Sequence, residues 1–398
     1  MRLLHTSDWH LGKRLCDTPL LEEQARALDQ IFAVLKDERV DALVMAGDIY
    51  DRSVPPEEAV TLFSEFLTRI SRDLKTTVVA ISGNHDSPER LGFGADILAR
   101  GRVFLRTSLE ARATPVMVET KRAKAAIYTL PYLDPQVARA VLGDESIAGH
   151  DAAVRSSLVA AKAHKLANPV DHAVLVAHLF ARGGIESVDS ERPLVVGGAA
   201  HVGADALDGF GYVALGHLHA PQIVAGREDI RYSGSPLKYS FCEARQKKGV
   251  ELVEFILGRP TVRTIPLVAR RDLMRIEGAF DELLAHPRFA EAENAFVEAT
   301  FTDTSYLIDV AARLRVRFPH LLVAQARHLI EAERTGIAAP ASRDLDLHRD
   351  TRELLKGFFR HVTGEDALDE EHLTVFEEAL EHVSGGASSR RADVSGAA

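Results

Sequence analysis

Short apolar runs alternate with helical patterns along the first half of the chain. Five runs are rich in Val, Leu, Ile and Ala, as is typical of buried strands, and they span 2–6, 40–47, 76–83, 171–178 and 211–217. The segments 21–38 and 55–74 place apolar side chains on one helical face and charges elsewhere, which predicts amphipathic helices. This alternation of strands and helices predicts a layered α/β domain.

The pattern changes after Gly234. Residues 247–257 and 260–268 are typical of two adjacent strands joined by a Gly-Arg-Pro turn, which closes the first domain near residue 268. The order strand, helix, strand, helix, strand then predicts a small α/β capping domain at 269–340. Two further helical patterns predict a helix pair within 344–383, and residues 384–398 lack apolar anchors and are expected to be disordered.

Composition narrows the class of protein. The chain is 46% hydrophobic and 27% charged, and no apolar run approaches the ~20 residues of a membrane helix. No export signal is visible, and the two cysteines, Cys16 and Cys242, lie outside any CxxC spacing, so we expect a cytoplasmic, nucleoid-associated protein with reduced thiols. The net charge of −10 argues mildly against nucleic-acid binding, but divalent ions bound to carboxylates would reduce it.

Polar side chains that can bind metal follow each of the five predicted strands. They are Asp8 and His10, then Asp48 and Asp51, then Asn84, His85 and Asp86, then His178, and finally His217 and His219. Ligand sites in layered α/β folds collect beyond the carboxyl ends of the strands. We therefore expect these stretches to deliver their side chains to one place.

The residue types match one kind of site. Carboxylate, amide oxygen and imidazole together suit Mn, Fe or Zn. Seven candidate ligands are too many for one ion but fit two ions that share a bridging carboxylate, a site that holds a phosphate and activates water. Each motif alone is also compatible with turn or capping chemistry or with a structural histidine. The whole series, with Gly47, Gly83 and Gly216 allowing close backbone approach, predicts a two-metal phosphoesterase.

The series D-x-H, G-D, G-N-H, H and G-H-x-H resembles the calcineurin-like metallophosphoesterases. The stretches "HTSDWHLG", "AGDIYDRSVPP", "GNHDSPERL", "ALGHLHAPQ" and "RYSGSPLKYSF" are more similar still to the SbcD nuclease subunits of bacterial SbcCD complexes. The resemblance is dense over residues 1–268. It implies a layered α/β/β/α metallophosphoesterase domain there, followed by the small α/β cap and a C-terminal helical pair.

The resemblance also implies a role for each residue. The metal ligands it implies are Asp8, His10 and His219 for one ion, Asn84, His178 and His217 for the other, and Asp48 as the bridge. His85 would face the scissile phosphate, stabilise its charge and protonate the leaving oxygen. The usual metal in this branch of the family is Mn²⁺, which these ligands permit.

Asp51 departs from part of the family. Archaeal relatives carry a histidine at this position, whereas "GDIYDR" follows the G-D-x-x-D-R pattern of protein phosphatases. We expect the Asp51 carboxylate to orient and charge His85 as a catalytic dyad. The alternative is an ordinary aspartate in a surface turn.

Three features favour DNA as the substrate: the match around Trp9, residues 87–88 and residues 233–236, then the cap, and finally basic residues near the motifs. The Trp9 side chain itself is expected to pack in the core or in a loop. The basic residues are Lys13, Arg14, Arg52, Arg90, Arg231 and Lys238. The function implied is a Mn-dependent nuclease of DNA repair, recombination and replication. It would be a 3′–5′ exonuclease on double-stranded ends and an endonuclease on single strands and hairpins. The alternatives are a phosphatase or cyclic phosphodiesterase, and a non-catalytic DNA scaffold.

The partners expected follow from the same resemblance. The chain has no GxxxxGK[ST], so an ATPase must be another polypeptide, here an SbcC-type coiled-coil protein. Apolar stripes in 344–383 would bind this partner, or else pack on the cap. The family also forms homodimers through helices that correspond to residues 56–70 and 88–100.

Overall fold

The computed structural model describes residues 1–121, 123–187, 201–256, 259–305, 307–330 and 375. The first of two six-stranded sheets consists, from edge to edge, of β16 (Arg259–Pro266), β15 (Gly249–Ile256), β1 (Arg2–Thr6), β4 (Ala42–Ala46), β5 (Thr77–Ile81) and β6 (Val103–Arg106). Strands β1, β4, β5 and β6 are parallel, and β15 and β16 are antiparallel additions at one edge. The predicted strands of this sheet are confirmed.

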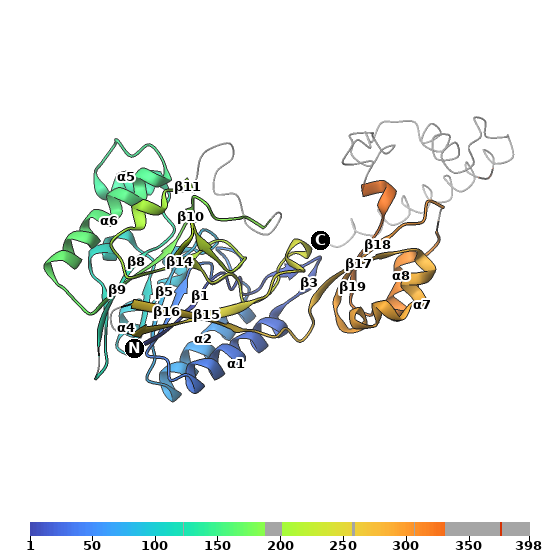
Figure 1. Ribbon diagram of the computed structural model, residues 1–398, viewed down its shortest axis with the longest axis horizontal. Coiled ribbons are helices and arrows are strands. Elements are labelled where there is room, and N and C mark those ends of the chain that lie inside the picture. Colours follow the sequence, from blue (N-terminus) through green and yellow to red (C-terminus); the bar gives the residue numbers. More distant parts are fainter. Residues whose placement is uncertain (122, 188–200, 257–258, 306, 331–374, 376–398) are drawn as a thin grey trace, which may run out of the picture. The chain divides into compact units, whose positions relative to one another are not determined.

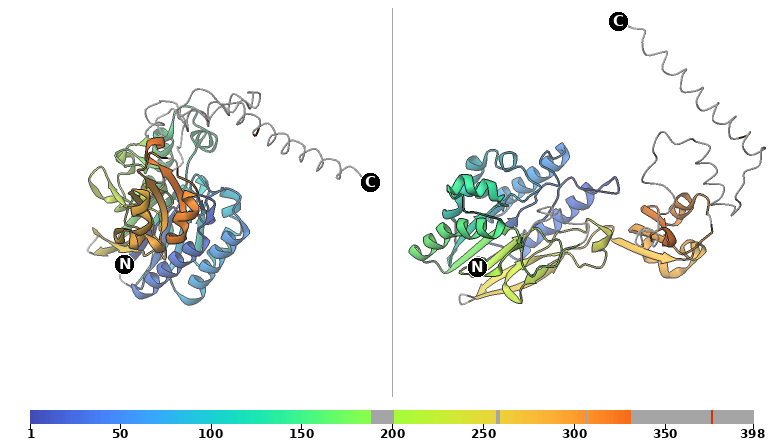
Figure 2. Two further views of the ribbon diagram at one scale, coloured as in Figure 1. Left: turned by 90° about the vertical axis from the view of Figure 1, so that its right-hand side faces the viewer. Right: turned by 90° about the horizontal axis from the view of Figure 1, so that it is seen from above.

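Two helices cover the outer face of this sheet. Helices α1 (Leu21–Asp37) and α2 (Glu57–Asp73) lie side by side (Figures 1 and 2). Side chains alternate along each strand because successive Cβ atoms point to opposite faces. Leu4 and Leu43 therefore share a core with α1 and α2, whereas their neighbours Leu3 and Val44 pack between the sheets.

The second sheet has the order β13 (Gln222–Val224), β14 (Arg227–Tyr232), β12 (Tyr212–Gly216), β9 (His172–His178), β8 (Lys124–Leu130) and β7 (Val116–Glu119). Its four central strands are parallel. Helices α5 (Pro135–Leu142) and α6 (His150–Ala167) pack against its outer face. The inner faces of both sheets share one core, which includes Val79, Val174 and Val176. The result is the expected α/β/β/α layering, although β7, β8, α5 and α6 were not predicted.

Shorter elements connect these layers. The short strands are β2 (Arg14–Leu15), β3 (Thr18–Pro19), β10 (Phe180–Ala181) and β11 (His201–Val202). The short helices are α3 (Pro88–Leu91) and α4 (Ala95–Ala99), with single 3-10 turns η1 (Leu109–Ala113), η2 (Ala204–Leu207) and η3 (Phe241–Glu243). Among the described residues, none of the helices combines the length and apolar character needed to cross a membrane.

The predicted order of the cap elements is confirmed. The elements are β17 (Leu273–Gly278), α7 (Phe280–Ala285), η4 (Pro287–Asn294), β18 (Phe296–Phe301), α8 (Val310–Arg317) and β19 (Leu321–Ala326), and the three strands form one sheet. The chain divides into two compact units: Met1–Glu277, Asp281–Ala299 and Ala311–Ala324 form one, and Gly278–Phe280, Thr300–Val310 and the chain from Gln325 onwards form the other. Apart from Val375, the predicted helix pair at 344–383 and the tail at 384–398 lie outside the described residues.

A buried imidazole lies between the two sheets. The His5 side chain on β1 is fully buried, with Nδ1 3.0 Å from the Tyr212 hydroxyl and Nε2 3.1 Å from the Leu215 carbonyl oxygen. Burial lowers the pKa of His5 to about 3, so this imidazole is neutral in the folded protein.

This burial predicts a pH dependence of stability. Between about pH 3 and 6.5 the unfolded chain binds a proton at His5 that the folded chain does not, so stability falls as the pH is lowered through this range. We expect His5→Gln to flatten the dependence of the unfolding free energy by about 1.4 kcal/mol per pH unit. Denaturant titrations from pH 4 to 7 measure the difference, and equal slopes would contradict it.

Candidate metal centre

The loops that follow five strands meet at the carboxyl edge of the two sheets. β1, β4 and β5 run parallel in one sheet, and β9 and β12 run parallel in the other. The structure brings together all the predicted metal ligands and His85. Asp8, Asp48 and the four histidines among the ligands are buried, and Asn84 and His85 are half-buried.

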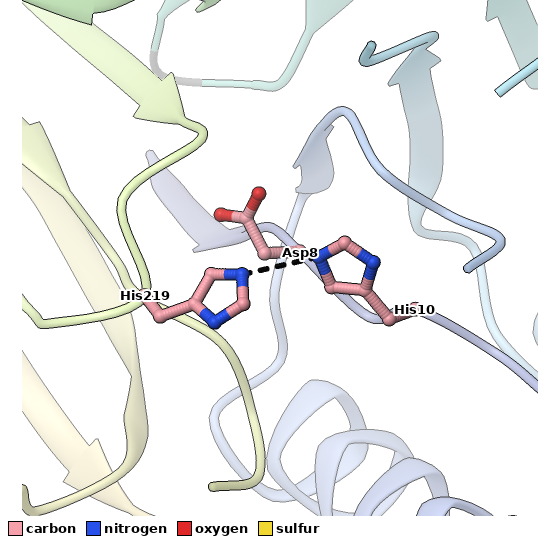
Figure 3. A group of neighbouring side chains, drawn as sticks. All are labelled: Asp8, His10 and His219. Carbon is pink, nitrogen blue, oxygen red and sulfur yellow. Dashed lines mark hydrogen bonds between the residues drawn. The ribbon is translucent and has the colours of Figure 1, made fainter. Parts of the chain in front are cut away.

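Asp8, His10 and His219 form the first cluster. Their potential ligand atoms all lie within 4.8 Å of one another. Figure 3 shows the two imidazoles facing each other, with His10 Nε2 3.1 Å from His219 Nε2. The Nδ1 atom of His10 is buried, and within the part of the chain that the structure describes it has no hydrogen-bond partner. Burial and the neighbouring imidazoles hold the pKa of His10 well below its usual value, so its ring is neutral and able to bind a metal.

Asn84, His178 and His217 form the second cluster. The Asn84 Oδ1 atom lies 2.9 Å from His178 Nε2 and 3.3 Å from His217 Nδ1. Burial lowers the pKa values of both histidines, which favours the neutral form. This cluster therefore gathers one amide oxygen and two imidazoles.

Asp48 lies between the two clusters. Its Oδ2 atom is 3.6 Å from His178 Nε2 and 3.7 Å from His10 Nε2, whereas Oδ1 accepts the backbone N–H of His85 at 2.8 Å. One carboxylate thus reaches both groups of imidazoles. This is the position that a bridging ligand requires.

Four of these residues have a strained backbone. Asp8, His10, Asp48 and His217 have φ values of 54°, 44°, 50° and 111°. A non-glycine residue in this region costs about 1–3 kcal/mol and persists only where its surroundings enforce it. Hydrogen bonds supply that constraint: Asp8 N–H donates to Gly47 O, and His10 N–H donates to Asp48 O, both at 3.0 Å.

Two of the predicted glycines are required because a side chain at either position would not fit. A Cβ atom on Gly83 would lie 2.1 Å from Asp48 Oδ1 and 2.4 Å from Asp48 N. One on Gly216 would lie 1.9 Å from the Ala46 carbonyl oxygen. All three distances are far inside van der Waals contact, so the loops pack this closely only because these residues lack side chains.

The fold and the ligand geometry agree with the sequence of a known family. The family model described as calcineurin-like phosphoesterase matches residues 1–221, more than half of the 398 residues. The chain belongs to the calcineurin-like phosphoesterase family. A second family model, SbcD_C, described as type 5 capsule protein repressor C-terminal domain, matches residues 269–363. Together the two matches confirm the predicted resemblance to SbcD-type chains.

One solved structure is also similar. A crystal structure of the calcineurin-like phosphoesterase YfkN from Bacillus subtilis matches at 14% sequence identity and a TM-score of 0.37. The match covers 67% of this chain and 90% of that chain.

The donor set of this calcineurin-like phosphoesterase fits divalent metal ions. Carboxylate oxygen and neutral imidazole nitrogen are combined within each group of side chains that could hold an ion. Uncompensated burial of so many polar groups would be costly, and among the described residues none forms a hydrogen bond with His10 Nδ1. Family membership and this geometry together make the chain a metal-dependent phosphoester hydrolase.

The Asp51 dyad differs from its prediction. The Nδ1 atom of His85 donates to the backbone carbonyl of Asp51 at 2.8 Å, and not to its carboxylate. That carboxylate instead accepts from Lys13 Nζ at 2.9 Å and lies 3.6 Å from His10 Nδ1. The two residues are therefore in contact, but the side chain of Asp51 is engaged by a lysine that sequence spacing did not connect to it.

Several supporting residues were missed by the sequence analysis. The Asp86 carboxylate accepts the backbone N–H groups of Ile49, Tyr50 and Gly83, and so joins the loops after β4 and β5. Burial and Asp48 raise the pKa of Asp86 to about 7, although these hydrogen bonds act in the other direction. Asp86 belongs to the quoted "GNHD" motif, so its position was visible but its role was not.

Gln24 and Glu243 support the first cluster, and no motif marks them. Gln24, buried on α1, donates to the His10 carbonyl at 2.7 Å and accepts from Gly12 N–H at 3.0 Å. The Glu243 Oε1 atom lies 3.2 Å from His219 Nδ1. Burial alone would raise the pKa of Glu243, but the hydrogen bond from His219 and the ammonium of Lys248 lower it to about 2.

Trp9 and two of the basic residues near the motifs contribute to the internal structure. Trp9 is fully buried, donates to Thr6 Oγ1 at 2.9 Å and packs edge-on against Phe66 of α2, which confirms its expected place in the core. Among the basic residues, Lys238 pairs with Asp272 at 2.7 Å and Arg231 lies 3.4 Å from Glu251. These two cations therefore contribute to the internal structure.

Gly83 offers a direct test of the packed loops. We expect Gly83→Ala to displace Asp48 and to weaken Mn²⁺ binding by about tenfold or more, because the new methyl group overlaps the Asp48 carboxylate. Isothermal titration of the full-length protein measures the affinity. Gly149→Ala, whose Cβ would meet no atom within 4 Å, is the matched control, and unchanged binding in Gly83→Ala would contradict the packing argument.

Proposed function

We propose that this protein is the Mn²⁺-dependent nuclease subunit of an SbcCD-type DNA repair complex. The observation that carries the proposal is the combination, in one chain, of the buried Asp, Asn and His cluster with a C-terminal match to SbcD-type proteins. Its reaction is phosphodiester hydrolysis, as a 3′–5′ exonuclease on double-stranded ends and an endonuclease on single strands and hairpins. Such an enzyme acts on chromosomal DNA in the cytoplasm.

The side chains would divide between two ions. Asp8, His10 and His219 would hold one, Asn84, His178 and His217 would hold the other, and Asp48 would be their shared ligand. Bound ions would supply positive charge that draws in the phosphate and would lower the pKa of a bound water. The protein itself keeps His10, His178 and His217 neutral by burial and fixes the ligand positions through the strained loops.

His85 would act on the leaving group. Its Nδ1 is held by the Asp51 carbonyl, and its Nε2 lies 4.0 Å from Asp48 Oδ2, on the side of the cluster. A protonated ring held in this way can stabilise charge on the phosphate and donate a proton to the departing 3′ or 5′ oxygen. Asp51 thus supports the catalytic histidine through its backbone.

A basic cleft beside the cluster supports DNA as the substrate. The cleft has a volume of about 560 Å³ and is lined by Lys13, Arg14 and Arg52 together with Pro55 and Pro56. Lys13 connects it to the cluster through its ion pair with Asp51. Cations in such a groove contact backbone phosphates on either side of the cleaved bond.

The alternatives make different demands on the site. A phosphatase or cyclic phosphodiesterase would use the same ions, but it would not need this groove beside them. A non-catalytic scaffold would need neither the neutral imidazoles nor the strain at Asp8, His10, Asp48 and His217. The nuclease is the one function that uses the cluster and the groove together.

Two protein partners complete the proposal. An SbcC-type coiled-coil ATPase would dock on residues 344–383, which lie largely outside the described residues. A second copy of this chain would bind an apolar groove of about 620 Å³, lined by Val60, Phe63 and Leu67 of α2 and by Phe93 and Ile97. Phe93 and Ile97 are 86% and 74% exposed, so they are available to a partner.

Labelled blunt duplex DNA with Mn²⁺ tests the activity. We expect wild-type protein to cleave it and His85→Ala to lose about 10²–10⁴-fold in rate, because the leaving oxygen then departs without its proton. Metal content should stay unchanged, since His85 is not a proposed ligand. Release of phosphate from monoesters without DNA cleavage would favour the phosphatase alternative.

Asp51→Asn is the companion variant. It keeps the carbonyl that binds His85 but loses the ion pair with Lys13. We expect a much smaller loss of rate than in His85→Ala. An equal loss at full metal content would mean that the carboxylate acts on His85 after all.

The apolar groove lined by α2, Phe93 and Ile97 predicts that the protein is a dimer. We expect Phe93→Glu to convert a dimer into a monomer, because it places a charge in the apolar contact, and light scattering measures the mass. Leu166→Glu is the matched control, since Leu166 on α6 is equally exposed, at 86%, but lies outside the groove. A wild-type protein that is monomeric in the presence of DNA would contradict the proposal.

A further inference from the structure

We propose that Glu243 is a positioning residue that fixes the ring of His219 for metal binding, with Lys248 holding the carboxylate in place. The inference rests on the proposed two-metal function. Glu243 lies at the end of η3, far along the chain from every metal-binding motif, yet its side chain is fully buried against His219. Its Oε1 atom is 3.2 Å from His219 Nδ1.

Several donors fix the Glu243 carboxylate. The backbone N–H of Tyr239 donates to Oε1 at 3.2 Å, and Lys248 Nζ forms an ion pair with Oε2. Lys248 also donates to the carbonyl of His219 at 2.7 Å and to Ser235 Oγ at 2.9 Å. One buried ammonium therefore holds both the backbone of His219 and the carboxylate that binds its ring.

This arrangement selects one tautomer of His219. An ionised carboxylate only accepts hydrogen bonds, so in the neutral form of the ring Nδ1 carries the proton and Nε2 presents its lone pair. Nε2 is the atom that faces His10 Nε2 in the first cluster (Figure 3). A carboxylate on the far nitrogen also makes the imidazole a more basic ligand.

The other imidazoles with a fixed Nδ1 have weaker anchors. His178 Nδ1 lies 2.8 Å from the Ala46 carbonyl, and His85 Nδ1 lies 2.8 Å from the Asp51 carbonyl. Both anchors are neutral backbone oxygens, whereas His219 has an anion. Loss of Glu243 should therefore weaken the ion held by Asp8, His10 and His219 and spare the other.

Manganese titration of the full-length protein tests this selectivity. We expect two ions to bind the wild-type protein and one of them to bind Glu243→Gln about 10–100-fold more weakly. Glu251→Gln is the matched control, because Glu251 is an equally buried carboxylate, bonded to Thr264 at 2.8 Å, that touches no proposed ligand. Unchanged binding of both ions in Glu243→Gln, or an equal loss in Glu251→Gln, would overturn the proposal.

The double variant Glu243→Gln, Lys248→Met separates positioning from stability. Removing both charges avoids leaving a buried ammonium unpaired, so the fold should be more stable than in Glu243→Gln alone. The carboxylate that binds the His219 ring and the ammonium that binds its carbonyl are then both missing, and we expect the weak metal binding to persist. If the metal affinity of the double variant recovers fully together with its stability, Glu243 acts only by stabilising the fold.

A readout without metal keeps this test apart from the proposed function. In ¹⁵N-histidine-labelled, chelator-treated wild-type protein, with His219 assigned by comparison with His219→Gln, we expect the Nδ1–H tautomer. The Nε2–H tautomer would overturn the role of Glu243 whatever the substrate. Failure of the wild-type protein to cleave DNA would contradict only the nuclease assignment.

Discussion

At their carboxyl edge, the two sheets are joined through the carbonyl group of Ala46. This oxygen ends β4 in the first sheet and accepts a hydrogen bond from His178 Nδ1 at the end of β9 in the second. Gly216, at the end of β12, packs so close to the same oxygen that a Cβ atom would lie 1.9 Å from it. A polar contact and a missing side chain thus bring three strand ends within reach of one another. Asp48 follows Ala46 by two residues and lies 3.6 Å from the same imidazole, so its position between the two clusters depends on this contact.

The site lowers the stability of the folded chain in two ways. Imidazoles and carboxylates are taken out of water, and four of their backbones adopt conformations that non-glycine residues avoid. The compensation comes from outside the cluster: Gln24, Asp86 and Lys248 all bond the backbone of the ligand loops. The apolar core between the sheets is continuous from β5 to β12. Burial of this core supplies the rest of the stabilisation that offsets the two costs. The helices and sheets therefore act as a rigid frame for a locally unfavourable arrangement.

The sequence predicted the parts of this protein that follow from local pattern. The ligand-bearing strands were recognisable because each is a continuous apolar run that stops at a polar residue, and parallel strands share one carboxyl edge. Helix α6 was harder to recognise because its alanine-rich sequence, with buried Ala153 and Ala161, has no strong apolar face. The supporting roles of Gln24 and Glu243 were not predicted for a different reason, because only the tertiary fold determines which residues they contact. A sequence also does not reveal that the backbone carbonyl of Asp51, and not its carboxylate, binds His85 Nδ1.

The contact between Asp8 and His217 spans 209 residues, and it has a consequence for synthesis of the chain. At about 5–20 residues per second, a ribosome would complete Asp8 roughly 10–40 seconds before His217 appears. During this interval β1 also lacks β15, its antiparallel neighbour in the first sheet. The nascent amino-terminal half thus exposes an apolar strand edge and unsatisfied acidic and imidazole groups. Correct folding of the chain therefore depends on this half neither aggregating nor binding metal ions before the last strands are synthesised.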